Sequence, residues 1–152
     1  MSTGLVALAF RNAQGRARAL MHEIGLSLAQ RWRALADRFG TPLVAANALL
    51  LMIASWTPGG LMVRSGIFSG HVEHMVAYAL SGALMHAARA GRTTAWQAAL
   101  MLSAFAGVLE LGQIFVPGRH ASLDDFLFSV TGAITGALVS AALLKHAHLG
   151  GK

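Results

Sequence analysis

Residues 122–144, SLDDFLFSVTGAITGALVSAALL, form a long apolar run that opens with two acidic residues. About 20 apolar residues in a helix are enough to cross the hydrocarbon core of a bilayer. Ser122 followed by Asp125 has the spacing of a capping box, which starts the helix at Leu123. Gly132 and Gly136 repeat at a helical interval and permit the close approach of another backbone. We therefore predict a membrane-spanning helix over 123–144 that packs tightly on a neighbour.

Three further apolar stretches precede this one. Thr41-Pro42 has the pattern of a helix start, and the break at 57–60 ends that stretch at Trp56. The next two stretches cover about 72–88 and 95–116. The sequence thus predicts an all-α integral membrane bundle of about four transmembrane helices.

The composition agrees with a membrane protein. Hydrophobic residues make up 55% of the chain and charged residues 12%, about half the share of roughly 25% that soluble domains carry. The net charge of +6 does not indicate a nucleic-acid partner, because basic and aromatic residues are not interleaved. The absence of cysteine excludes disulfides and thiolate metal ligands.

The segment before the first apolar stretch is basic and has a helical period. Residues 16–39 carry apolar side chains at steps of three or four, with arginines between them: Leu20, Ile24, Leu28, Trp32, Leu35 and Phe39. Such an amphipathic helix either lies on anionic cytoplasmic lipid or packs on the bundle as a cap. Both alternatives remain open from the sequence.

The Lys and Arg residues predict the orientation in the membrane. Ten of the twelve lie in the amino-terminal segment, the 89–94 loop or the carboxyl-terminal tail, which places both termini in the cytoplasm. We expect a multi-pass protein of the bacterial inner membrane with three parts. These are a basic cytoplasmic or interfacial segment (1–40), a four-helix transmembrane domain (41–145) and a cytoplasmic tail (146–152).

Most ionisable side chains outside the basic segment gather at the extracytoplasmic ends of the predicted spans. Four of the six acidic residues lie there. The full set is Arg64, His71, Glu73, His74, Glu110, Arg119, His120, Asp124 and Asp125.

Helical spacing places some of these side chains on common faces. His74 and Tyr78 are four residues apart, and Glu110 and Gln113 are three apart. Glu110 lies inside its predicted span, where an acidic side chain needs a partner or water. Arg119, His74 and Tyr78 are the candidate partners, and a structural Glu110–Arg119 pair is the alternative to a functional role.

An ordered set of motifs resembles the VanZ-like family. It consists of His74-x-x-x-Tyr78, Glu110-x-x-Gln113-x-Phe115, Pro117-Gly118-Arg119-x-x-Ser122-x-x-Asp125 and Gly132-x-x-x-Gly136. The resemblance covers about residues 70–140. This chain has Gly70-His71 where the family commonly has an acidic-basic pair, and Ser129 where it commonly has Asn.

The family is named for a protein that lowers susceptibility to teicoplanin, and its biochemical mechanism is not established. The resemblance implies a polar site made of His74, Tyr78, Glu110, Gln113, Arg119, Ser122 and Asp125, with Gly132 and Gly136 in helix packing. We expect a non-enzymatic protein, without a cofactor, that binds an amphiphilic ligand at the outer leaflet. The expected partners are membrane lipids and a lipid-linked envelope precursor or lipoglycopeptide, and the oligomeric state is left open.

Two other functions remain open. In an intramembrane enzyme, Glu110 and His74 would act as general base and acid, or His71, His74 and Glu110 would hold a metal. In a haem or pigment carrier, His86 and His146 would be the ligands, because both fall near cytoplasmic helix ends.

Overall fold

The computed structural model describes residues 3–61 and 69–149 of the chain. The described residues form α1 (Thr3–Trp56), a short 3₁₀ turn η1 (Gly59–Leu61), α2 (Gly70–Ala88), α3 (Ala95–Gln113) and α4 (Leu123–Leu149). They contain no strand, so the predicted all-α class is confirmed. Inside these helices, the side chains that are not described belong to residues 3–10, 25–29, 32, 33, 37, 148 and 149.

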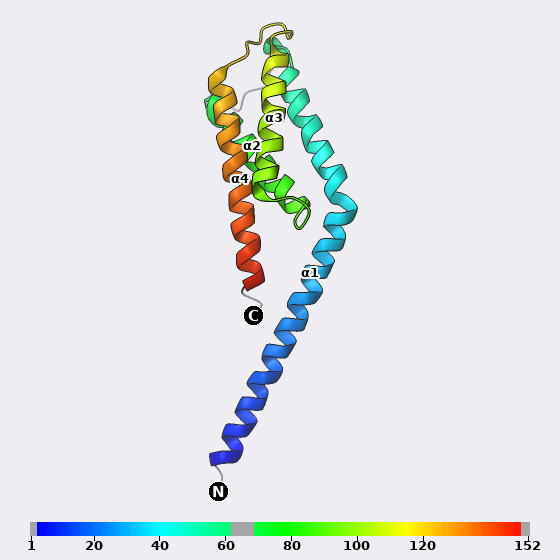
Figure 1. The fold of residues 1–152 in the computed structure, drawn as a ribbon, viewed down its shortest axis with the longest axis vertical. Helices are drawn as coiled ribbons and strands as arrows, with labels where there is room; N and C mark the ends of the chain where they lie inside the picture. The colour runs from blue at the N-terminus through cyan, green and yellow to red at the C-terminus, as the bar shows by residue number, and fades with distance from the viewer. Residues whose placement is uncertain (1–2, 62–68, 150–152) are drawn as a thin grey trace.

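Helix α1 runs without interruption through the expected break. Pro42 lies inside this helix, so the prediction that a new helix begins at Thr41-Pro42 is wrong. A proline within a helix loses one backbone hydrogen bond and bends the axis. Figure 1 shows that α1 changes direction in its light-blue to cyan part, the range that contains Pro42. One bent helix therefore joins the basic segment to the bundle.

The amino-terminal half of α1 extends away from the other helices (Figure 1). Leu20 and Ile24 are exposed, so this part does not pack on the bundle as a cap. Leu28 and Trp32, which belong to the same predicted apolar face, lie outside the described side chains.

Helices α2 and α4 pack along a seam of small residues. A β-carbon at Gly132 would collide with the carbonyl oxygen of Met75, and one at Gly136 with that of Ala79. A β-carbon at Gly82 of α2 would likewise collide with the carbonyl oxygen of Ala133 in α4. Contacting residues advance together along both helices, so α2 and α4 run in parallel and begin at the same end of the bundle.

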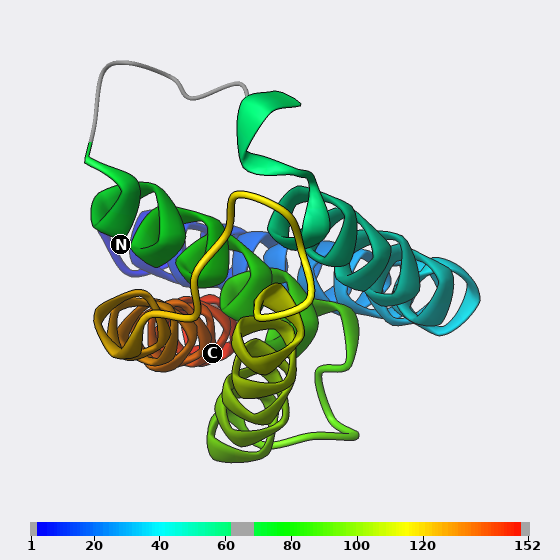
Figure 2. The same ribbon diagram turned by 90° about the horizontal axis from the view of Figure 1, so that it is seen from above.

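The other two helices complete the bundle around this pair. α3 packs on α4 and α2, whereas α1 packs on α2 and α3 (Figure 2). The Trp56 indole Nε1 donates a hydrogen bond to the Leu109 carbonyl at 3.3 Å, which fixes the end of α1 against α3. The buried core is small and rich in alanine, as close helix packing in lipid requires.

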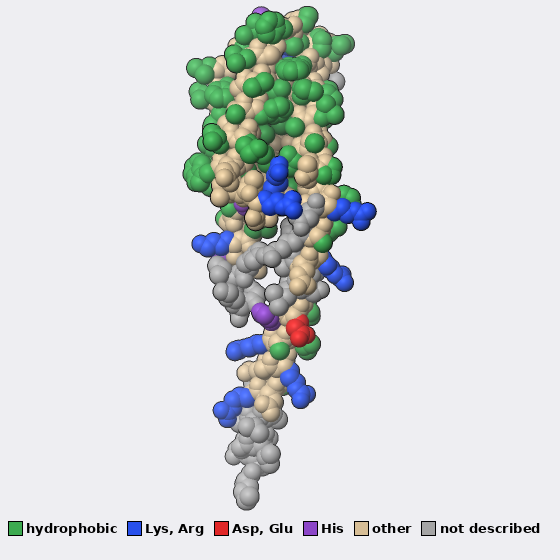
Figure 3. All heavy atoms as spheres, turned by 45° about the vertical axis from the view of Figure 1, so that its right-hand side comes forward, with side chains coloured by type: hydrophobic (Ala, Val, Ile, Leu, Met, Phe, Trp, Pro, Cys, Tyr) green, Lys and Arg blue, Asp and Glu red, His purple; other side chains and the backbone are tan. Residues whose placement is uncertain are grey.

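Three helical segments are long and apolar enough to cross a membrane: 38–56, 95–113 and 123–147. Helix α2, over which a span was predicted, is 19 residues long but is not among these three segments. On the face shown in Figure 3, hydrophobic side chains cover the bundle, while Lys and Arg gather at its lower end and along α1. The chain therefore has the surface of a membrane protein.

We predict that Gly136→Ala destabilises the protein by about 1–3 kcal/mol, because the added methyl group overpacks the α2–α4 seam. Thermal unfolding in detergent measures this effect. Gly15→Ala is the matched control, since a β-carbon at Gly15 meets no atom within 4 Å. The control should be neutral or stabilising by about 0.5–1 kcal/mol, as expected for alanine in a helix. A Gly136→Ala protein as stable as the wild type would contradict the described seam.

Candidate functional site

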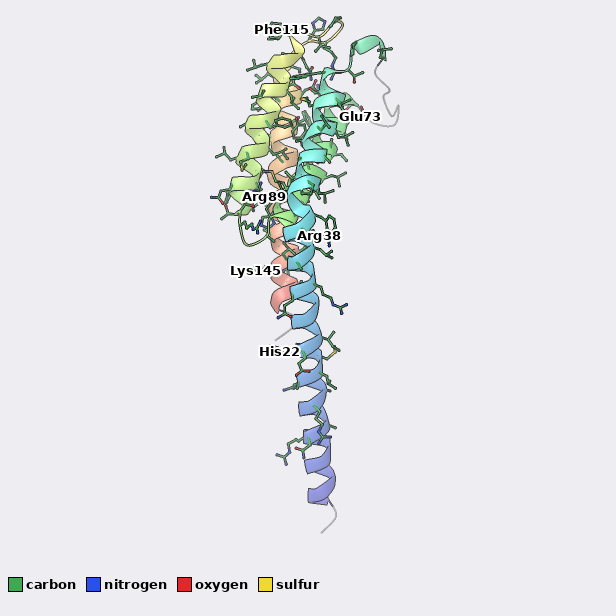
Figure 4. The ribbon with its side chains drawn as sticks, turned by 90° about the vertical axis from the view of Figure 1, so that its right-hand side faces the viewer. His22, Arg38, Glu73, Arg89, Phe115 and Lys145 are labelled. Atoms are coloured by element: carbon green, nitrogen blue, oxygen red, sulfur yellow. The ribbon has the colours of Figure 1, made fainter. Side chains whose placement is uncertain are left out.

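The polar site lies at the end of the bundle where α2 and α4 begin and α3 ends. Glu73 and Phe115 are near this end in Figure 4, whereas Arg38, Arg89 and Lys145 are toward the other. The two connecting loops meet here, because the Gly59 amide donates a hydrogen bond to the Pro117 carbonyl at 3.2 Å. Polar side chains from four segments of the chain thus come together at one end.

The parallel α2–α4 pair brings two histidines to α4. His74 Nδ1 lies 3.3 Å from Ser129 Oγ, and its Nε2 lies 4.0 Å from Asp125 Oδ2. His71 Nε2 lies 3.6 Å from Asp125 Oδ1, and its ring stacks on Phe128 with centroids 5.2 Å apart. Asp125 therefore lies between two imidazoles.

Glu110 of α3 is hydrogen-bonded to Ser122, the residue that caps the amino terminus of α4. Ser122 Oγ accepts a hydrogen bond from the Asp125 amide at 3.3 Å, which is the first half of the predicted capping box. The second half comes from α3, because Glu110 Oε2 accepts the Ser122 amide at 3.1 Å. The Asp125 side chain does not serve as the reciprocal acceptor, and it faces the histidines instead.

These arrangements place three ionisable groups in one cluster. Atoms of His74, Glu110 and Asp125 all lie within 4.8 Å of one another. Glu110 is only 7% exposed, and Tyr78, which is 5% exposed, is near enough to interact with it electrostatically. The metal site considered from the sequence had His71, His74 and Glu110 as ligands. The structure groups Asp125, rather than His71, with His74 and Glu110.

Gln113 and Arg119 meet on α1, at Ser55. Gln113 Nε2 donates to Ser55 Oγ at 2.9 Å. Arg119 donates to the Ser55 carbonyl from Nε at 3.3 Å and from Nη2 at 3.0 Å. The expected Glu110–Arg119 pair is not formed, because each side chain has a different partner.

A cavity of about 400 Å³ opens beside the cluster. Its polar wall includes His71, His74 and Asp125 of the cluster region, and Arg119 lines it from the loop. Its apolar wall comes from Leu51, Ala54 and Ala77 of α1 and α2. The cavity has the two-sided lining that an amphiphilic molecule needs.

Sequence reasoning missed the part played by Ser55, since a serine inside an apolar stretch carries no pattern. Ser129, which stands where the family commonly has Asn, is fully buried and contacts His74. It therefore belongs to the polar network. His120 and Asp124 are exposed and have no contact with the cluster in the described part of the chain. Arg64 lies outside the described residues.

His86 and His146, the ligands of the haem alternative, differ in their exposure to solvent. His86 is buried in the α2–α4 seam, where its Nδ1 lies 3.1 Å from Ser140 Oγ. His146 is exposed near the end of α4.

The fold and the site define a helical membrane protein with a partly buried polar cluster at one end of its bundle. Residues 5–145 match the family model described as VanZ/LLP1. The chain therefore belongs to the VanZ-like family. Searches of curated proteins and of solved structures found no match.

We predict that Ser55→Ala and Gln113→Ala are coupled in a double-mutant cycle. Each single change leaves the other buried polar group without its partner, which costs about 1–3 kcal/mol. The double mutant should cost less than the sum of the two by about 0.5 kcal/mol or more, measured by thermal unfolding in detergent. A second cycle, with Glu110→Gln and Arg119→Lys, is the control and should show a smaller coupling. Strict additivity of the first pair would refute the Ser55 contact.

Proposed function

We propose that this VanZ-like protein crosses the bacterial cytoplasmic membrane four times, with both termini in the cytoplasm. We further propose that it binds the head of an amphiphilic envelope ligand in the cavity at the extracytoplasmic end. The ligand class is a lipid-linked cell-wall or polysaccharide precursor, or a lipoglycopeptide. The observation that carries the proposal is the cavity itself, which joins an apolar wall to a charged one.

The length of α2 and the partners of its polar side chains support a fourth span. Its 19 residues give a length of about 28 Å, close to the thickness of the hydrocarbon core. Its low hydropathy comes from polar side chains that have partners inside the bundle. His74 contacts Ser129, Ser81 donates to Asn47 Oδ1 at 3.2 Å, and His86 contacts Ser140. Internal partners reduce the cost of placing such groups in lipid.

The charge distribution supports the orientation. Arg38, Arg89 and Lys145 lie toward the end of the bundle opposite Glu73 (Figure 4). Basic residues favour the cytoplasmic side, so the polar cluster would face the outer leaflet. On this arrangement the basic part of α1 lies in the cytoplasm or on its anionic lipid surface.

We predict this topology for single cysteines introduced into the cysteine-free chain. Ser69→Cys should react with a membrane-impermeant maleimide in intact spheroplasts, because position 69 precedes α2 at the extracytoplasmic end. Asn12→Cys, Arg92→Cys and Ala147→Cys should react only after permeabilisation. Labelling of both position 69 and position 92 in intact spheroplasts would exclude α2 as a span, and labelling of 12 or 147 would exclude the orientation.

The cavity lining is suited to a ligand with an anionic or hydrogen-bonding head. Arg119 is held by Ser55, so its guanidinium is preorganised at the cavity wall. A guanidinium recognises carboxylate and phosphate groups through paired hydrogen bonds. The apolar residues of α1 and α2 would contact the acyl or prenyl chain. Tyr78 is buried and lines the cavity, and the buried Gln113 supports it through its hydrogen bond to Ser55.

A second candidate function is intramembrane catalysis on a lipid-linked substrate. The proximity of His74 and Glu110 favours it, since an imidazole and a carboxylate within 4.8 Å of each other are suited to general acid–base chemistry. Turnover of a lipid-linked precursor by purified protein would distinguish this function from simple binding.

We predict that expression in a teicoplanin-sensitive Gram-positive host raises tolerance to teicoplanin more than tolerance to vancomycin. Teicoplanin carries an acyl chain that concentrates it in the outer leaflet, where the cavity would open. Minimal inhibitory concentrations of both drugs, measured with and without expression, check this expectation.

Single substitutions test whether the polar site causes the difference in tolerance between the two drugs. Glu110→Gln and Arg119→Ala should abolish the difference between the drugs while the protein still accumulates in the membrane. His146→Ala, at the opposite end, is the control and should retain it. Equal tolerance to both drugs, or protection that survives loss of Glu110 and Arg119, would contradict the outer-leaflet site.

A further inference from the structure

We infer that His74, Glu110 and Asp125 form a binding site for a divalent transition-metal ion such as Zn²⁺. The three residues come from α2, α3 and α4, and one atom from each lies within 4.8 Å of the others. One imidazole nitrogen and two carboxylate oxygens are a donor set that Zn²⁺ accepts. Remaining coordination positions would be filled by water or by a group from the cavity.

The separation between His74 and Asp125 is too long for a hydrogen bond and leaves room for a metal ion between the two side chains. His74 Nε2 and Asp125 Oδ2 are 4.0 Å apart, which is too far for a hydrogen bond. In a tetrahedral site, two ligands that each lie about 2.1 Å from the zinc ion are separated by about 3.4 Å. Because the three atoms all lie within 4.8 Å of one another, reaching this spacing requires the side chains to close by about 1.4 Å or less.

Each donor is oriented by a group behind it. Ser129 Oγ contacts His74 Nδ1, and a hydrogen bond from this nitrogen leaves Nε2 unprotonated for a metal. The Ser122 amide holds Glu110 Oε2. His71 contacts Asp125 Oδ1, the oxygen that does not face His74. Metal ligands in proteins commonly have such outer partners, which fix their geometry.

The charges of the cluster also favour a cation. The carboxylates of Glu110 and Asp125 lie close together, and like charges at this separation repel. Within residues 3–61 and 69–149, the ion-pair partners of Asp125 are His71 and His74, and Glu110 has no ion pair. Arg119 is directed to the Ser55 carbonyl rather than to either acid. A bound dication would neutralise both carboxylates without another basic residue.

The buried histidine at the other end of the seam provides a matched control. His86 and Ser140 reproduce the contact between His74 and Ser129 on the same two helices. His86 belongs to no group of three metal-ligating side chains among the described residues. His86→Gln therefore removes a histidine–serine contact of the same kind without changing the proposed donors.

The test is Zn²⁺ binding by the purified, chelator-stripped full-length protein in detergent. Isothermal titration with ZnCl₂ should show about one equivalent bound for the wild type and for His86→Gln. Glu110→Gln and Asp125→Asn should lose this binding. Ser129→Ala retains all three ligands and should bind about 10–100-fold more weakly, as the loss of an outer partner predicts.

Thermal unfolding separates lost ligands from lost folding. Zn²⁺ should raise the unfolding temperature of the wild type and of His86→Gln but not of Asp125→Asn, each starting from a cooperative transition. Absence of stoichiometric binding by the wild type would overturn the proposal. So would equal binding by wild type, Glu110→Gln and Asp125→Asn, which would indicate adventitious zinc on other histidines. The outcome does not depend on the envelope ligand, because the titration contains none.

Discussion

The close contact between α2 and α4 is the constraint on which the rest of the structure depends. Apolar helices gain little from the hydrophobic effect inside lipid, so backbone proximity has to hold them together. Gly132 and Gly136 provide it, since their missing β-carbons leave room for the carbonyl groups of α2. The same parallel contact starts both helices at one end and sets His74 against Ser129 and Asp125.

The polar cluster forms because the cap of α4 does not use the side chain of Asp125. In an ordinary capping box Asp125 would accept the Ser122 amide. Here Glu110 of α3 accepts it, and Asp125 turns to His71 and His74. The cap thereby links α3 to α4 and leaves a carboxylate for the site. Ser55 joins α1 to the same region through Gln113 and Arg119.

The sequence was sufficient for the helical class, the small-residue stripe and the set of polar residues at one end. It placed the starts of α3 and α4 at residues 95 and 123, where the structure has them, and the start of α4 was predicted from the capping motif at Ser122. It failed at Pro42, where a long helix bends instead of ending. It offered Arg119, His74 and Tyr78 as partners of Glu110, because spacing along helices cannot tell which neighbour supplies a partner. The structure brings His74 and Tyr78 near this residue but not Arg119. The role of Ser55 depends on tertiary contact alone.

Disulfide cross-linking tests the parallel α2–α4 contact most directly, because the chain has no cysteine of its own. Cysteine pairs at 74/129 and 86/140 should cross-link in the membrane under mild oxidation, since the native side chains at these pairs are in contact. The crossed pairs 74/140 and 86/129 should not, because about 16 Å of helix separates positions 129 and 140. Cross-linking of the crossed pairs without the direct ones would mean antiparallel helices and would contradict the account.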